Sequence, residues 1–476
     1  MAAITPHLAM APSVGMGHLI PQVEIAKRLV QLHGFSITFL VPGDGPPTTS
    51  QKLFLDSLPQ NMDYILLPSV SLADLPPETR VESRICLINS RSIPHLKQSL
   101  IELKARKPVV AFITDLFGTE GFHIAEELNL PAYLFFPSTA MVLSLFLYLP
   151  QLDSEVSCEF RDMDEPVRIP GCVPIHGSLL LDPFQDRKDD VYKHFLDQVK
   201  RFRMAKGILV NSFDELESGA LKALQEPEPG NYKPPVYPVG PLIQIGSSGS
   251  SAEEDKTGCL DFLNAQPDSS VLFVSFGSGG TLSYDQFIEL ALGLELSGQR
   301  FIWVIRSPSD TSDAAYLNGG KSDNPLAFLP DGYLDRVKER GFLVPSWAPQ
   351  AEILEHGSTG GFLTHCGWNS ILESVANGVA LIAWPLYAEQ KMNAVTVTNV
   401  LKVALRPKAN EVGVVEKEEI GRVVKSLIEG EEGKECRDRM MELKAATMKT
   451  LRSDGSSAKA LDKVADEWKS LFTQLN

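Results

Sequence analysis

Apolar and polar positions alternate along the chain in a pattern that predicts strands separated by helices. Leu8 to Ala11 is a short apolar run, apolar residues recur at helical spacing between 19 and 30, and a second apolar run, Ser36–Val41, follows Gly34. Short apolar runs are typical of buried strands, whereas apolar residues three or four apart are typical of a helix packed on one face. The start of the chain therefore predicts a strand, a helix and a second strand.

The same alternation continues to residue 241 and restarts after residue 257. Between them the chain reads PLIQIGSSGSSAEEDKT, a Gly- and Ser-rich stretch that is typical of a flexible linker. Strands that alternate with helices predict parallel sheets covered by helices on both faces. We therefore predict an α/β protein of two doubly wound, Rossmann-like domains, residues 1–241 and 258–457, facing across a ligand cleft. Residues 242–257 form the linker, and a C-terminal helix at about 458–476 packs back on the first domain.

The remaining predicted elements follow from the same patterns. Ser307 to Asn324 is polar and is expected to be a surface loop. The strands are expected at Val109–Thr114, Tyr133–Phe136, Gly207–Asn211, Val271–Phe276, Phe301–Ile305, Gly360–Thr364 and Ala380–Trp384, with helices over Tyr284–Leu296 and Ser370–Val375.

An uncharged stretch from Leu130 to Leu152 is long enough to cross a membrane. Pro131, the sequence Pro-Ser-Thr at 137–139 and Pro150 interrupt it, which favours a buried strand followed by a helix. We therefore expect no membrane span.

Composition narrows the classes of partner and of site. Lys and Arg number 44 against 60 Asp and Glu, which gives a net charge of −16. Nucleic acid is not an expected partner, because its binders carry a basic surface. The six cysteines form no C-x-x-C pair, and no H-E-x-x-H segment occurs, so we expect no metal site. The few, widely spaced cysteines indicate a reduced, intracellular protein, and the N-terminus has no basic region typical of a signal peptide, so we predict a cytoplasmic location. We also predict a monomer.

Three glycine-rich segments fail as nucleotide-binding motifs. Gly15-Met16-Gly17 and Gly277-Ser278-Gly279 lack the third glycine of a dinucleotide fingerprint, and the segment ending in Gly320-Lys321-Ser322 lacks the first glycine of a phosphate loop. No G-x-S-x-G segment occurs, which disfavours an α/β-hydrolase.

The most informative segment is the 44 residues from Trp347 to Gln390. A predicted strand ends there in HCGWNS (365–370), where a helix begins. His365, Asn369 and Ser370, together with the N–H groups at the start of the helix, form a site suited to a diphosphate. Glu373 can accept hydrogen bonds from ribose hydroxyls, and Trp347 offers a flat face for a base. Glu389 and Gln390 suit sugar hydroxyls.

This segment resembles the signature of the plant family 1 UDP-dependent glycosyltransferases in length, end residues and HCGWNS core. The VNSF, PVGPL and SFGSGG segments fit the same family, which implies the GT-B fold. ESR near residue 82, DLFGT at Asp115 and LYAEQKMNA most resemble the branch that glucosylates small phenols such as hydroquinone. Indoxyl and chlorinated phenols or anilines are acceptors of close relatives.

The resemblance also implies residue roles, and the chain departs from the family pattern at none of these positions. Trp347 and Ala348 would hold uracil, Gln350 and Glu373 the ribose, and Ser278, His365, Asn369 and Ser370 the diphosphate. Trp368, Glu389 and Gln390 would grip the glucose, with Thr139 reaching it from the other domain.

His18 and Asp115 each end a predicted strand of the first domain. An imidazole can take a phenolic proton near neutral pH, and a carboxylate partner fixes its tautomer. With the family resemblance, we predict His18 as the general base, assisted by Asp115. His18, Glu82, Ile85, Phe117, Phe146 and Ala388 are candidates for the acceptor pocket, although aromatic residues in apolar helices are generally core.

The predicted activity is inverting transfer of glucose from UDP-glucose, a co-substrate, to the hydroxyl of a small phenolic or indolic acceptor. No cofactor or metal is expected, because the helix start and His365 would stabilise the departing UDP. A larger flavonoid acceptor or N-glucosylation of anilines is the alternative. An epimerase or hydrolase of nucleotide sugars, a nucleotide-sugar-binding protein without turnover and a nicotinamide oxidoreductase are the other classes weighed.

Overall fold

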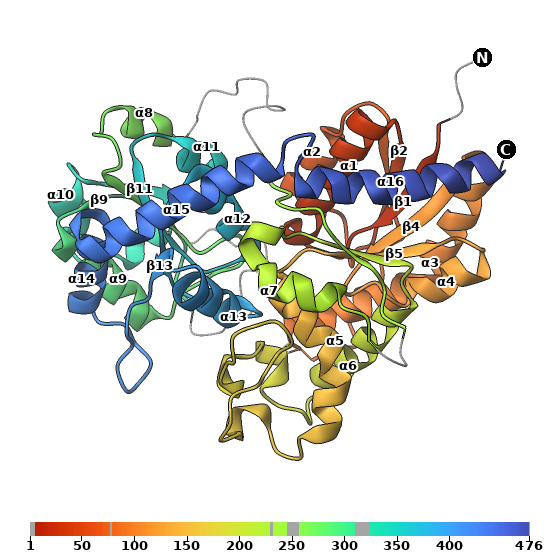
Figure 1. The fold of residues 1–476 in the computed structure, drawn as a ribbon. Coiled ribbons are helices and arrows are strands. Elements are labelled where there is room, and N and C mark those ends of the chain that lie inside the picture. Colours follow the sequence, from red (N-terminus) through yellow and green to blue (C-terminus); the bar gives the residue numbers. More distant parts are fainter. Residues whose placement is uncertain (1–4, 77–78, 229–231, 245–256, 310–323, 476) are drawn as a thin grey trace. The chain divides into compact units, whose positions relative to one another are not determined.

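The computed structural model describes residues 5–76, 79–228, 232–244, 257–309 and 324–475 (Figure 1). The chain divides into two compact units: the first contains Met1–Ile243 and Lys449–Asn476, and the second contains Gln244–Met448. The second unit therefore ends at Met448, nine residues before the end predicted from the sequence, residue 457. Most of the predicted linker over 242–257 and of the predicted loop Ser307–Asn324 lies outside the described residues.

A parallel sheet with the strand order β3-β2-β1-β4-β5-β6-β7 forms the centre of the first unit. The strands are β1 (His7–Ala11), β2 (Ser36–Val41), β3 (Met62–Leu66), β4 (Val109–Asp115), β5 (Ala132–Phe136), β6 (Gly207–Val210) and β7 (Val236–Pro238). The helices are α1 (Met16–His33), α2 (Thr49–Asp56), α3 (Val81–Arg106), α4 (Gly121–Glu127), α5 (Ala140–Glu155), α6 (Asp190–Arg201), α7 (Asp214–Gln225) and the C-terminal α16 (Ser456–Leu475).

The second unit repeats this architecture with the strand order β10-β9-β8-β11-β12-β13, again parallel. Its strands are β8 (Val271–Ser275), β9 (Arg300–Ile305), β10 (Gly341–Pro345), β11 (Thr359–Thr364), β12 (Leu381–Ala383) and β13 (Ala404–Leu405). Its helices are α8 (Cys259–Asn264), α9 (Tyr284–Ser297), α10 (Tyr333–Val337), α11 (Gln350–Glu355), α12 (Trp368–Asn377), α13 (Gln390–Val395), α14 (Lys417–Glu429) and α15 (Glu431–Thr450).

The sequence predicts the inner strands of both sheets and misses the four edge strands, β3, β7, β10 and β13. Inner strands of a parallel sheet are covered on both faces, so they read as continuous apolar runs. Edge strands here are short or partly exposed, as in β3, where only Met62 is buried. The predicted α/β class with two doubly wound sheets is confirmed.

The uncharged stretch from Leu130 to Leu152 folds as strand β5 followed by helix α5. Thr139 begins the helix as its N-cap, and most of the helix is buried inside the first unit. Among the described residues, no helix is both long and apolar enough to cross a membrane.

Helix α16 returns from the second unit and packs on the first, against β7, β4 and α1 (dark blue in Figure 1). Its Trp468 is completely buried, with ring centroids 5.9 Å from Phe35 and 5.2 Å from Tyr133. Glu467 accepts a hydrogen bond from the Tyr237 hydroxyl at 2.9 Å. The C-terminal residues thus complete the apolar core of the first unit.

We predict that Trp468→Ala destabilises the first unit by roughly 3–5 kcal/mol, because it leaves a cavity between two aromatic rings. Urea unfolding followed by near-ultraviolet circular dichroism measures the loss. Lys459→Ala, at an exposed position of the same helix, is the matched control and should unfold at the wild-type midpoint. An unchanged midpoint for Trp468→Ala would show that α16 is not part of the core.

Candidate functional site

In each sheet the strand order reverses beside one central pair of strands. In the first unit the chain moves outward from β1 to β3 and returns to β4 on the other side of β1; in the second unit the equivalent pair is β8 and β11. At such a pair, the chain leaves one strand toward one edge of the sheet and leaves its neighbour toward the other edge. The two connections therefore diverge at the carboxyl ends of the strands, where doubly wound folds bind their ligands. The strongest site candidates in the sequence follow these four strands.

His18 and Asp115 meet at the reversal of the first sheet. Asp115 is the last residue of β4, and His18 lies in the first turn of α1, which follows β1. Nδ1 of His18 is 2.9 Å from Oδ2 of Asp115. The Asp115 side chain is 0% exposed and that of His18 is 12% exposed. The imidazole is therefore the member of the pair that a substrate can reach.

Three further donors surround the buried Asp115 carboxylate. The N–H of Ser13 donates to Oδ2 at 2.9 Å, the Ser13 hydroxyl donates to Oδ1, and the N–H of Phe117 donates to Oδ1 at 3.2 Å. A buried carboxylate is costly unless such donors satisfy it. Held in this way, the carboxylate presents Oδ2 to Nδ1 of His18 at 2.9 Å.

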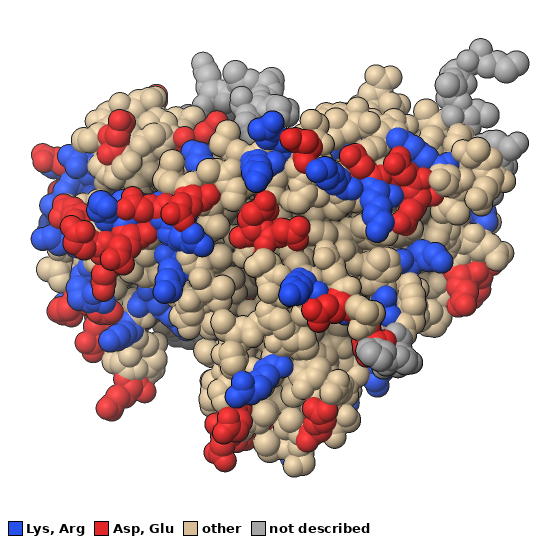
Figure 2. Space-filling view, viewed as in Figure 1, with Lys and Arg blue, Asp and Glu red and all other residues tan. Residues whose placement is uncertain are grey.

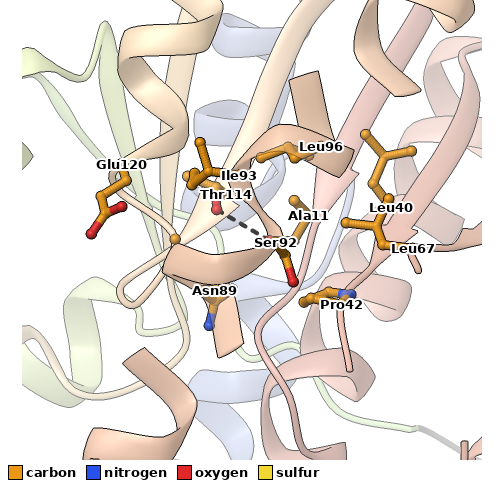
Figure 3. Close-up of a pocket in the computed structure, with 11 residues that line it drawn as sticks. Ala11, Leu40, Pro42, Leu67, Asn89, Ser92, Ile93, Leu96, Thr114 and Glu120 are labelled. Atoms are coloured by element: carbon orange, nitrogen blue, oxygen red, sulfur yellow. Dashed lines mark hydrogen bonds between the residues drawn. The ribbon is translucent and has the colours of Figure 1, made fainter. Parts of the chain in front are cut away.

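Sequence analysis missed Ser13 and Asn89. Asn89, on α3, donates to the Ser13 hydroxyl at 3.1 Å and to the Ile85 carbonyl at 2.9 Å. It also lines a small pocket, where Ser92 lies near it on the same helix (Figure 3). The Ser92 hydroxyl is buried without a hydrogen-bond partner among the described residues. The only sequence signal was that Ser13 lies just before the glycine turn.

The structure separates the candidates for the acceptor pocket. The Phe117 ring meets the His18 ring edge-on, with centroids 5.5 Å apart. Ile85 lies one turn and Glu82 two turns before Asn89 on α3, and the Ile85 carbonyl accepts the Asn89 side-chain N–H. Phe117 therefore contacts His18 directly, and Ile85 is connected to the pair through Asn89 and Ser13.

Phe146 is not among those surroundings. It is 1% exposed, and its ring meets that of Phe195 at 5.7 Å, which in turn meets Phe117 at 5.6 Å. Phe146 also contacts Phe136 and Phe202. It lies in an aromatic core behind Phe117, so the core interpretation of this residue fits better than the pocket interpretation.

Thr139 caps the start of α5, where its hydroxyl oxygen accepts the N–H of Val142 at 3.0 Å. The N–H groups of Ala140 and Met141 donate to the buried Glu217 at 2.8 and 3.0 Å. The donors at this helix start therefore bond within the chain. The hydroxyl oxygen of Thr139 is therefore engaged as a helix cap.

His365 follows β11 and is enclosed by two glycines. A Cβ at Gly277 would lie 2.6 Å from Nε2 of His365, and one at Gly367 would lie 2.4 Å from it, so neither position admits a side chain. Burial, with the positive charge of Arg306 adding to it, lowers the pKa of His365 to about 4. His365 is therefore neutral at neutral pH and offers a hydrogen bond rather than a charge.

Helix α12 begins at Trp368, two residues earlier than predicted, with Gly367 as its N-cap. Trp368, Asn369 and Ser370 thus form its first turn. Gly367 has no side chain that could cap this end, and helix N-termini attract anions through their N–H groups and dipole. Ser278 lies in the glycine loop after β8, the strand paired with β11.

Gln350 joins two of the predicted nucleotide-binding residues. Its side-chain amide donates to the Ser370 hydroxyl at 3.0 Å and to the Glu373 carboxylate at 2.6 Å. Burial raises the pKa of Glu373 to about 7, while the bond from Gln350 lowers it. The structure thus brings α11 and α12 together at a carboxyl group that titrates near neutral pH.

The two predicted uracil-binding residues differ in exposure. Trp347 is 67% exposed, so its ring can stack on a flat ligand, whereas Ala348 is buried. Both precede α11, which carries Gln350.

At the other end of the 44-residue segment, the Gln390 side chain forms hydrogen bonds with the backbone that the sequence did not predict. Its side-chain oxygen accepts the N–H groups of Leu386 and Tyr387 at 2.9 and 3.0 Å. The side-chain oxygen of Gln390 is therefore engaged within this turn. Ala388 has a φ of 53°, and Glu389 is the N-cap of α13, so this turn has a fixed, unusual backbone.

Among the described residues, no group of three or more His, Cys, Asp or Glu side chains could hold a metal ion. On the face seen in Figure 2, Lys and Arg are interspersed with Asp and Glu over α14 and α15.

Comparisons with known proteins identify the family of this chain. The family described as UDP-glucoronosyl and UDP-glucosyl transferase matches residues 235–447. Hydroquinone glucosyltransferase of Rauvolfia serpentina is 58% identical over 98% of both chains. Phytolacca americana UGT2, solved with UDP-2-fluoro-glucose and pterostilbene, is 51% identical with a TM-score of 0.89, over 98% of this chain and 100% of that one.

A second solved relative is a Polygonum tinctorium UDP-glucosyltransferase capable of glucosylating indoxyl, in complex with 3,4-dichloroaniline. It is 50% identical with a TM-score of 0.91, over 98% of this chain and 100% of that one. Identity at this level over almost the whole chain, together with the two parallel-sheet units, places the chain in one family. The protein belongs to the plant family 1 UDP-dependent glycosyltransferases, enzymes of the GT-B fold.

Proposed function

We propose that this enzyme transfers glucose from UDP-glucose to the hydroxyl of a small phenolic or indolic acceptor, with inversion at the anomeric carbon. The observation that carries the proposal is the 2.9 Å contact between His18 Nδ1 and the buried Asp115 carboxylate, at the reversal of strand order in the first sheet. It leaves the second nitrogen of His18 available to a substrate hydroxyl.

His18 acts as the general base of the proposed reaction. Nε2 removes the phenolic proton as the oxygen attacks the anomeric carbon, and Asp115 stabilises the imidazolium that results. The aromatic ring of Phe117, 5.5 Å from the His18 ring, provides an apolar wall for a flat acceptor.

The second unit binds the donor in this proposal. The start of α12 and the neutral His365 donate to the diphosphate and stabilise the charge on departing UDP. Trp347 stacks on uracil, Glu373 accepts from the ribose hydroxyls, and Glu389 and the amide hydrogens of Gln390 bind glucose. No metal ion has a part in this scheme. The cytoplasmic location and the monomeric state stay predictions.

The acceptor class is supported by the relatives. The Rauvolfia serpentina relative is a hydroquinone glucosyltransferase, and the Phytolacca americana relative was solved with pterostilbene. The Polygonum tinctorium relative is capable of glucosylating indoxyl and was solved with 3,4-dichloroaniline. These molecules share a small aromatic ring. Because one of the complexes holds an aniline, N-glucosylation of anilines is the second candidate activity.

An acceptor panel with UDP-glucose tests this function. We expect hydroquinone, indoxyl and chlorophenol to form β-glucosides in excess chelator, ahead of a flavonol, with chloroaniline as the test of the second activity. UDP-galactose should react about 10–100-fold less efficiently, because an inverted hydroxyl leaves a buried partner unpaired. Mass spectrometry detects the products and nuclear magnetic resonance assigns the anomer. An α-glucoside would contradict inversion, and loss with chelator that magnesium restores would contradict a metal-independent mechanism.

His18→Gln should lower kcat for hydroquinone by about 10²–10⁴-fold, because the amide can keep a bond to Asp115 but cannot accept a proton. The affinity for UDP should stay within about twofold, and phenols already ionised at the assay pH should lose less activity. His123→Gln, at an exposed histidine of the same unit, is the matched control. Wild-type turnover of hydroquinone by His18→Gln would rule out His18 as the base.

Uridine binding should strengthen as pH rises from 6 to 8. The ribose hydroxyls donate to the Glu373 carboxylate, so the ionised form binds better, and its pKa of about 7 means that this form dominates only above neutral pH. The expected gain is up to about tenfold, the change in the ionised fraction over this range. Uridine is the probe because it carries no phosphate that titrates in this range. Competition binding should find weaker, pH-independent affinity for Glu373→Gln; a wild-type affinity that is flat with pH would contradict the assignment.

A further inference from the structure

Arg306 bridges two loops that carry proposed donor-binding residues, although sequence analysis gave it no role. It follows β9 directly, and its guanidinium donates to the Ser278 carbonyl at 2.5 Å and to the Ser346 carbonyl at 3.1 Å. Ser278 belongs to the glycine loop after β8, and Ser346 immediately precedes Trp347. The Arg306 side chain thus connects the glycine loop, which is proposed to bind the diphosphate, to the segment that contains Trp347, which is proposed to stack on uracil.

Both loops have backbone conformations that need such support. Gly277 has a φ of 73°, and Ser346 has a φ of 68°, which is unusual for a residue with a side chain. The N–H of Ser346 donates to the Ile305 carbonyl at 3.0 Å, so Ser346 is held from both sides by consecutive residues, Ile305 and Arg306. The direction of Trp347 therefore depends on this pair of bonds.

The charge of Arg306 also reaches the diphosphate site. Its Nε atom is buried without a hydrogen-bond partner among the described residues, and the side chain lines a pocket together with Gly277 and Gly280. Burial lowers the pKa of the guanidinium, which nevertheless stays charged at neutral pH. The same charge lowers the pKa of His365. The site therefore has a neutral histidine and a poorly solvated cation beside it.

We propose that Arg306 is a positioning residue of the donor site: it fixes the glycine loop and the Trp347 segment relative to each other and supplies the positive charge that favours a diphosphate. This inference rests on the proposed donor site and deepens it. A bidentate bridge between two carbonyls requires the planar guanidinium, whereas the ammonium of lysine supplies the charge without that geometry.

Calorimetric binding of UDP and of uridine to the full chain separates this role from simple loss of structure. For Arg306→Gln we expect UDP affinity to fall about 10–100-fold and uridine affinity to fall by less than about fivefold. The uridine loss is small because the bond from the Ser346 N–H to the Ile305 carbonyl still supports the Trp347 segment, so the loss falls mainly on the diphosphate. Arg306→Lys should lie between this variant and the wild type. Arg300→Gln removes the same charge from the opposite end of β9 and should leave both affinities within about twofold.

Two results would overturn the inference: UDP affinity of Arg306→Gln within twofold of the wild type, or an equal loss for UDP and uridine. If Arg306→Gln melts too low to be measured, Arg306→Lys is judged by the same two criteria. A wild-type chain that binds no UDP would instead overturn the proposed donor site. Failure of acceptor turnover alone would leave the inference standing.

Discussion

The parallel pairing of β1 with β4, and of β8 with β11, determines where chemistry can occur in this molecule. Each pair joins strands that are far apart in the sequence and whose onward connections leave on opposite sides of the sheet. The register aligns Ala11 with Thr114, and Thr364 with Ser275, so the loops that follow begin side by side. Backbone N–H groups at the ends of such strands and at the starts of the next helices are not used by the sheet. Polar side chains and ligands can use them.

Burial then sets the chemical character of each group placed there. Asp115 is buried but has donors from Ser13 and Phe117, so it can orient His18. His365 is buried with glycines on both sides and a cation nearby, and its pKa is lowered to about 4. Glu373 is desolvated, and its pKa is raised to about 7. The same cost of burying a charge thus governs a hydrogen-bonded carboxylate beside His18 in one unit, and a neutral histidine and a carboxyl group with a raised pKa in the other.

The sequence predicts what depends on local pattern and misses what depends on distant partners. Inner strands such as β5 can be predicted because both of their faces are covered, which makes them continuous apolar runs. The two-residue β13 is too short to produce such a run. The predicted start of α12 at Ser370 was late, because Gly367 caps the helix with its backbone and no side-chain signal marks the position. The contact of His18 with Asp115 could be expected, because both residues follow strands of one predicted sheet, but His18 lies in the first turn of α1 and does not end a strand as predicted.

The roles of Asn89, Arg306 and the side-chain oxygen of Gln390 could not be expected from the sequence. Asn89 acts on Ser13 from a helix far along the chain, and Arg306 bonds to backbone carbonyls, which every sequence offers. Phe146 is an aromatic residue of the kind that can line an acceptor pocket, but its neighbours in space are other aromatic rings. Such assignments require the positions of side chains relative to one another, which periodicity does not contain.

The central claim is that Asp115 holds His18 as a base with Nε2 directed to the acceptor. The most direct measurement is the ¹⁵N nuclear magnetic resonance spectrum of the chain labelled in its histidine rings, with His18→Gln identifying the His18 signals. The account predicts that neutral His18 carries its proton on Nδ1, bonded to Asp115, and that Asp115→Ala removes this preference. A neutral His18 protonated on Nε2 in the wild type would contradict the account, because that nitrogen could not then accept the proton of a phenol.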